Sequence, residues 1–74
     1  MQQYTTEWAK EYLREHESCI ATTQDRSGCV YAWRYTHKIE HNQHYIELIC
    51  ELYLGEMLEH PDGWKNSLVT RDML

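Results

Sequence analysis

The stretch HKIEHNQHYIELICELYLGEML, residues 37–58, decides the fold that the sequence predicts. Its apolar side chains recur at steps of three and four residues, the spacing that lines one side of an α-helix. We therefore expect a long helix that begins at about Glu40 or Asn42 and ends before Pro61, which cannot continue a helix. Its core-facing stripe consists of Ile46, Ile49, Tyr53 and Met57.

The opposite side of this predicted helix changes character along its length. It begins with acids and histidines and ends with Leu54 and Leu58. A helix that is apolar on every side is normally buried on every side, and so short a chain has little material to bury it. Either the segment 64–74 folds back over both leucines, or the leucines form the centre of an interface with an acidic rim. The predicted partner-binding residues are Glu47, Glu51, Leu54, Leu58 and Trp64.

Upstream of residue 37 the sequence predicts a helix and a β-hairpin. Thr5 or Thr6 can cap a helix that runs from about Thr6 to His16. The segment SCIATTQDRSGCVYAWRYT, residues 18–36, is rich in β-branched and aromatic residues on both sides of a DRSG turn. The predicted architecture is therefore a single small α+β domain over residues 1–74, of order α-β-β-α. The hairpin packs against the N-terminal helix and the longer second helix, and a short C-terminal element follows.

The four-residue turn sets the expected register of the hairpin. If Gln24 pairs with Cys29, the two cysteines Cys19 and Cys29 point to opposite faces, which excludes a disulfide between them. A two-stranded hairpin is marginal by itself and needs helices over one of its faces, and we expect the aromatic face to be the one that they cover. That face holds Ser18, Ile20, Thr22, Tyr31, Trp33 and Tyr35.

The chain is acidic, with twelve Asp and Glu against seven Lys and Arg and a net charge of −5. Binding to nucleic acid or to an anionic membrane depends on clustered basic residues, and here they are scattered. A basic protein surface is the better partner. The N-terminus lacks the pattern of a signal peptide, no apolar run is long enough to span a bilayer, and three cysteines exclude a closed set of disulfides. We therefore expect a cytoplasmic protein.

Histidines near the start of the predicted helix raise a metal-binding alternative. His37, His41 and His44 have spacings that can place two imidazoles on one helical face. Structural zinc sites combine closely paired ligands, whereas the three cysteines here stand far apart. No nucleophile elbow or glycine-rich phosphate loop is present. The sequence therefore predicts no enzyme activity, no cofactor and no metal, with the histidine site as a third alternative.

The predicted function is that of a small acidic protein-interaction module that binds another protein, or a second copy of itself, through the C-terminal half of the long helix. The alternative is a nucleic-acid mimic whose carboxylates occupy a basic groove; its affinity would fall steeply with added salt. In size, charge and aromatic content the chain is similar to phage and mobile-element proteins that inhibit host nucleic-acid enzymes or defence systems, a likeness that rests on no motif. The mimic would use Glu40, Glu47, Glu51, Glu56 and Glu59.

Overall fold

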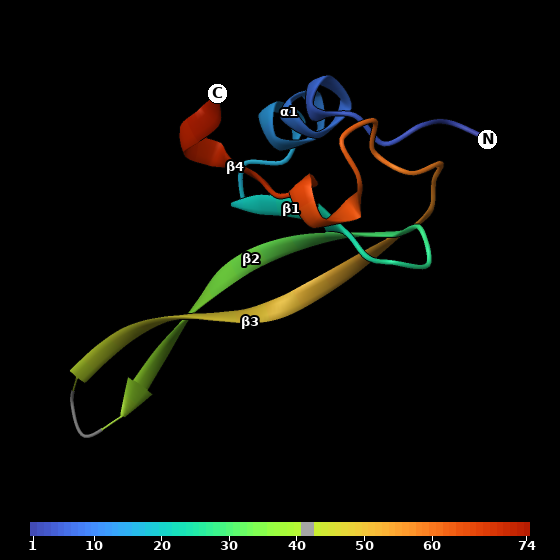
Figure 1. Ribbon diagram of the computed structural model, residues 1–74. Coiled ribbons are helices and arrows are strands. Elements are labelled where there is room, and N and C mark those ends of the chain that lie inside the picture. The colour runs from blue at the N-terminus through green and yellow to red at the C-terminus, as the bar shows by residue number, and fades with distance from the viewer. Residues whose placement is uncertain (41–42) are drawn as a thin grey trace.

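A computed structural model describes the backbone of residues 1–40 and 43–74 and the side chains of residues 1–34 and 51–74. The described part contains one α-helix and one antiparallel sheet with the strand order β3-β2-β1-β4 (Figure 1). Within it, no helix combines the length and apolar character that crossing a bilayer requires. In chain order the elements are α1 (Thr6–Glu15), β1 (Ala21–Gln24), β2 (Cys29–Glu40), β3 (Gln43–Glu56), the 3-10 turn η1 (Trp64–Asn66), β4 (Val69–Thr70) and the 3-10 turn η2 (Arg71–Met73).

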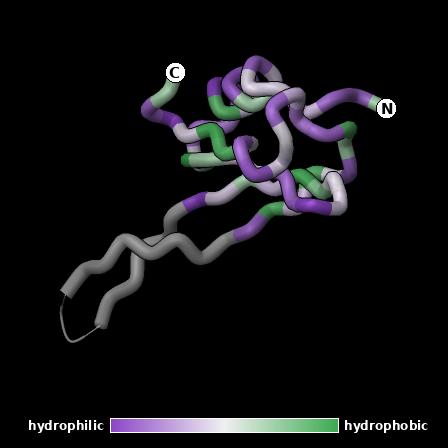
Figure 2. The backbone as a smooth tube through the Cα atoms, in the orientation of Figure 1, coloured by the Kyte–Doolittle hydropathy of each residue, from purple (hydrophilic) through white to green (hydrophobic). Residues whose placement is uncertain are grey.

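Helix α1 agrees with the prediction to within one residue. Thr5 is extended, and its hydroxyl accepts the backbone N–H of Trp8 at 3.0 Å, which satisfies one of the free donors at the start of the helix. Hydrophilic and hydrophobic residues alternate around α1 (Figure 2). Its apolar side packs Ala9 and Leu13, both fully buried, against the sheet. Local capping and periodicity were therefore sufficient to predict this element.

The predicted long second helix is not present, because residues 43–56 form strand β3. β3 pairs antiparallel with β2 from Cys29 opposite Glu56 to Glu40 opposite Gln43. In the sequence IELICELYL, residues 46–54, every second residue from Ile46 onward is apolar, and this is also the period of a strand. A short apolar segment fits both periods, and the ladder with β2 selects the strand. Beyond Trp33, the described pairing of β2 is with β3 alone, and the two strands continue as a two-stranded ribbon (Figure 1).

The hairpin between β1 and β2 exists, but its register differs by one residue from the predicted one. Gln24 lies opposite Val30, not opposite Cys29. The difference arises in the loop, where the Asp25 carboxylate accepts the backbone N–H groups of Ser27 at 2.9 Å and Cys29 at 3.0 Å. These bonds hold Cys29 against the loop. A shift of one residue turns every side chain of a strand to the other face, so the residues of β2 lie on the faces opposite to the predicted ones, whereas Thr22 of β1 lies on the covered face as predicted.

The structure therefore corrects the prediction that the aromatic face is covered. Helix α1 lies over the face that carries Thr22, Val30 and Ala32, all buried. Tyr31 and Trp33 lie on the other face and are only half-buried. We call this second face the open face. The apolar core lies between α1 and the covered face and consists of Tyr4, Ala9, Leu13, Cys19, Val30, Ala32, Met57 and Val69.

The C-terminal segment forms an edge of the sheet instead of a cover for Leu54 and Leu58. In β4, Val69 pairs with Thr22 of β1, at the edge opposite to β3. The guanidinium of Arg71 then donates to the backbone carbonyl oxygens of Leu13, His16 and Cys19, at 2.5 to 2.9 Å. These carbonyls lie at and just beyond the end of α1, where helices leave acceptors without partners. Arg71 thus ties the last residues of the chain to the first helix.

Candidate functional site

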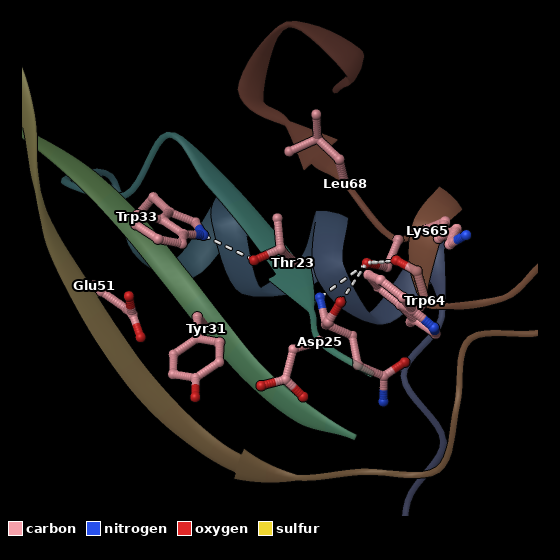
Figure 3. A pocket seen from close by; sticks show the side chains of 10 residues that line it. Thr23, Asp25, Tyr31, Trp33, Glu51, Trp64, Lys65 and Leu68 are labelled. Carbon is pink, nitrogen blue, oxygen red and sulfur yellow. Dashed lines mark hydrogen bonds between the residues drawn. The ribbon is translucent and has the colours of Figure 1, made fainter. Parts of the chain in front are cut away.

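The open face of the sheet contains a groove of about 420 Å³ (Figure 3). Strands β1, β2 and β3 form its floor, and the segment around η1 forms its wall. Aromatic side chains line both, and two carboxylates and one ammonium group are also among the lining residues. The lining residues are Thr23, Gln24, Asp25, Tyr31, Trp33, Glu51, Trp64, Lys65, Ser67 and Leu68.

The floor of the groove consists of two rows of side chains that cross the sheet. In one row Thr23 lies opposite Tyr31, and Tyr53, which is not a lining residue, continues this row beyond the groove with its ring centroid 5.7 Å from that of Tyr31. In the other row Trp33 lies opposite Glu51. Directly opposed residues of antiparallel strands share a face. The indole N–H of Trp33 donates to the Thr23 hydroxyl at 2.8 Å, which links the two rows and fixes the indole ring (Figure 3).

A buried polar residue, Ser67, holds the wall of the groove against the floor. Its hydroxyl accepts the backbone N–H of Gln24 at 2.9 Å and donates to the carbonyl oxygen of Trp64 at 2.6 Å. Trp64 therefore begins a short turn whose backbone is fastened to β1. Leu68, one residue further on, leaves 55% of its surface exposed and lines a smaller apolar cavity of about 190 Å³ with Ala21, Thr23 and Trp33.

The buried amide of Gln24 fixes the connection between β3 and this wall. Its nitrogen donates to the carbonyl oxygens of Met57 at 3.0 Å and Leu58 at 3.1 Å, and its oxygen accepts the backbone N–H of His60 at 2.8 Å. Among the described residues this connecting segment pairs with no strand of the sheet; its backbone forms the isolated bridge between Gln3 and Leu58, and the Met57 N–H donates to the carbonyl oxygen of Gly28 at 2.9 Å. The side chain of Gln24 thus replaces a strand in satisfying this backbone.

The groove carries a negative electrostatic character. The pKa of Asp25 is lowered, chiefly because the Ser27 hydroxyl donates to its carboxylate, so Asp25 is ionised at neutral pH. The pKa of Tyr31 is raised, first by partial burial and then by its neighbours, which include Cys29, Asp25 and Glu51. Figure 3 shows the ring of Tyr31 between the side chains of Asp25 and Glu51. The phenol stays neutral, and both carboxylates are close enough to influence it.

One cation already lies on the wall of the groove. The ammonium nitrogen of Lys65 is 5.7 Å from the ring centroid of Trp64, within the range of a cation–π interaction. Lys65 is exposed, and in the described part of the chain the only ion pair joins Arg14 to Glu11 on α1. Neither carboxylate of the groove forms an ion pair with a described basic side chain.

The structure places only two of the predicted partner-binding residues in one site. Glu51 and Trp64 both line the groove. Leu54 is half-buried against the core, at an irregularity of β3 beside Gly55, whose φ of 105° suits glycine. Leu58 is 52% exposed, and its backbone pairs with the N-terminal segment instead of lining the groove. The side chain of Glu47 lies outside the described ones.

Sequence reasoning missed most residues of the groove. The alternation of Tyr31 and Trp33 was visible, but the register error assigned both to the core. The sequence identified Asp25 only as a turn residue. Its place in a turn next to the aromatic residues of the strand could have indicated that its carboxylate lies beside their rings. Thr23 and Leu68 carry no signal in the sequence that singles them out.

The described residues give no support to either alternative site, the carboxylate row of a nucleic-acid mimic or the histidine metal site. The carboxylate row of a nucleic-acid mimic required the absent helix; Glu51, Glu56 and Glu59 are exposed, and the side chains of Glu40 and Glu47 are not described. His41 lies outside the described residues, as do the side chains of His37 and His44. In the described part no three His, Cys, Asp or Glu side chains gather as metal ligands. Comparison of the chain with models of protein families, with curated proteins and with solved structures found no match.

Proposed function

We propose that the protein is a protein-interaction module that binds an extended, basic segment of a partner protein in the groove on the open face of its sheet. The observation that carries this proposal is an uncovered row of aromatic side chains beside two carboxylates, with Trp33 hydrogen-bonded to Thr23 and the wall of the groove held by the buried hydroxyl of Ser67. Tyrosine and tryptophan are enriched in protein interfaces, because their rings bury a large area and lose little conformational entropy. The site differs from the predicted one, and the class of function is the same.

The charge of the groove favours a basic protein segment over nucleic acid. Aromatic side chains on an open antiparallel sheet also occur in proteins that stack nucleic-acid bases, but those sites combine the rings with a basic surface. Here Asp25 and Glu51 flank the ring on which a base would stack, and the whole chain carries a net charge of −5. A phosphate backbone would be repelled at this position. A lysine- or arginine-containing peptide would be attracted to it.

The proposal is tested by selecting random peptides on the immobilised protein and measuring their affinity for matched variants. Leu68→Ser removes an exposed leucine of the groove, and Leu58→Ser removes a leucine of nearly equal exposure outside it. A leucine buried by a ligand contributes about 1.5–3 kcal/mol, so L68S should weaken binding about tenfold or more. L58S should leave it unchanged. Equal affinity for both variants and the parent protein would contradict the proposal.

Light scattering distinguishes a foreign partner from a second copy of the chain. If the groove binds a different protein, the isolated chain should be monomeric. A dimer that L68S dissociates and L58S does not would instead identify a second copy as the occupant. An inhibitory action on a host enzyme or defence system stays a prediction of the composition alone.

A further inference from the structure

We infer that the groove recognises an arginine side chain of its partner, with the guanidinium stacked on the ring of Tyr31 or Trp33 and paired with the Glu51 carboxylate. This inference rests on the proposed function and specifies the residue that the groove selects. It follows from the order of groups across the floor, where an aromatic ring, a carboxylate and a second aromatic ring are neighbours on adjacent strands.

The register of the strands places an anion beside an aromatic surface. Glu51 lies directly opposite Trp33, and the row formed by Tyr31 and Tyr53 is the next one along the same face. Glu51 forms no ion pair with a described basic side chain, and it is exposed at a groove whose other lining residues include Tyr31, Trp33 and Trp64. A cation that enters the groove would meet both a ring face and a carboxylate, two attractions that act in the same place.

A guanidinium fits this arrangement better than an ammonium group. It is planar and weakly hydrated, stacks on aromatic rings, and can donate two parallel hydrogen bonds to one carboxylate. An ammonium group is a compact point charge that keeps its water. One oxygen of the second carboxylate, Asp25, already accepts hydrogen bonds from Ser27 and Cys29, so Asp25 cannot offer both oxygens to a guanidinium. Asp25 therefore adds negative potential, and Glu51 is the direct partner.

Lys65 provides an internal comparison. Its ammonium nitrogen lies over the Trp64 ring, so the wall of the groove already carries one positive charge. The same charge repels an incoming guanidinium, since like charges in one groove are unfavourable. Removing the charge of Lys65 should therefore strengthen arginine binding, and removing the charge of Glu51 should weaken it. A purely structural role for either residue does not predict opposite effects.

The test uses two small probes, Nα-acetyl-arginine amide and its neutral isostere Nα-acetyl-citrulline amide. Binding is followed through the indole N–H signals of Trp33 and Trp64 in proton–nitrogen correlation spectra. The arginine probe should shift the Trp33 signal and bind about tenfold more tightly than the citrulline probe, because its hydrogen bonds to carboxylate are charge-assisted. Glu51→Gln should remove this difference, and Lys65→Met should increase the affinity for the arginine probe about twofold or more. Glu17→Gln, an exposed acid after α1, makes the same change of net charge and should have no effect.

The outcomes separate this inference from the proposed function. Equal binding of the two probes, or an E51Q effect no larger than that of E17Q, would overturn the arginine inference. Selected peptides that still respond to L68S would then leave the proposed function standing. If neither probes nor selected peptides depend on any groove residue, both proposals fail together.

Discussion

Replacing Gln24 by Met tests whether a single buried amide holds the connection that carries the wall of the groove. Gln24 is 3% exposed, and its side chain serves the carbonyl oxygens of Met57 and Leu58 and the N–H of His60. Methionine has a similar length and no amide. The substitution therefore keeps the volume of the side chain and leaves the Met57 carbonyl oxygen and the His60 N–H without partners, whereas the Leu58 carbonyl oxygen still accepts the N–H of Tyr4.

The expected loss follows from the number of groups that become unsatisfied. A buried donor or acceptor without a partner costs about 1–3 kcal/mol. For these two groups together we expect a loss of about 2–4 kcal/mol, because some of the penalty is relieved where water reaches the connection. A domain of 74 residues is stable by about 4–11 kcal/mol at the usual value per residue. Gln24→Met should therefore remove a large part of the stability of the protein.

The measurement is urea denaturation followed by far-ultraviolet circular dichroism, with thermal unfolding as a second readout. At this chain length each kcal/mol corresponds to about 4–8 °C in the melting temperature. The matched control is Gln3→Met, because the amide of Gln3 makes one exposed hydrogen bond to the carbonyl oxygen of Glu59. The control should change stability by about 0.5 kcal/mol or less. A Gln24 variant that is as stable as the control would refute the reasoning.

Further predictions concern the two ends of α1 and the loop of the hairpin. Arg71→Lys should destabilise the fold by about 1–3 kcal/mol in the same denaturation assay, because a single ammonium group cannot reach all the carbonyl oxygens that the guanidinium contacts, from Leu13 to Cys19. A variant as stable as the parent would contradict this role of the Arg71 hydrogen bonds. Thr5→Ala should cost about 1 kcal/mol and Thr5→Asn much less, since asparagine also caps helices. Asp25 has a lowered pKa in the folded state through the Ser27 hydroxyl, so its contribution is present above the unfolded value of 3.8 and is lost as the pH falls through the folded value. The difference in stability between Asp25→Ala and the parent should therefore be largest above pH 3.8 and shrink as the pH falls below that value, and a difference that does not change with pH would exclude this linkage.

The parts of the fold that sequence reasoning predicted are those that local interactions decide. Helix α1 has a cap at Thr5 and an apolar side of regular period, and both act within the helix itself. Strand β3 depends on its partner β2, because its apolar pattern satisfies the period of a helix as well as that of a strand. A tertiary contact therefore selected between two locally acceptable structures.

The candidate site was harder to predict, because it depends on two non-local facts. The first is the one-residue change of register, which the side chain of Asp25 imposes and which exposes Tyr31 and Trp33. The second is the path of the C-terminal segment, which Ser67 fastens beside β1 so that Trp64 stands over the same face. Neither fact follows from composition or periodicity.

The hydrogen bonds of the Arg71 guanidinium to the end of α1 affect the rates of folding and unfolding. They join groups separated by more than fifty residues in the chain, and the bond between Gln3 and Glu59 has a similar separation. Contacts that close such long loops carry a large entropic cost, and we expect them to form after the transition state, later than the turn between β1 and β2. In stopped-flow experiments a change at Arg71 should therefore speed unfolding and leave refolding almost unaltered.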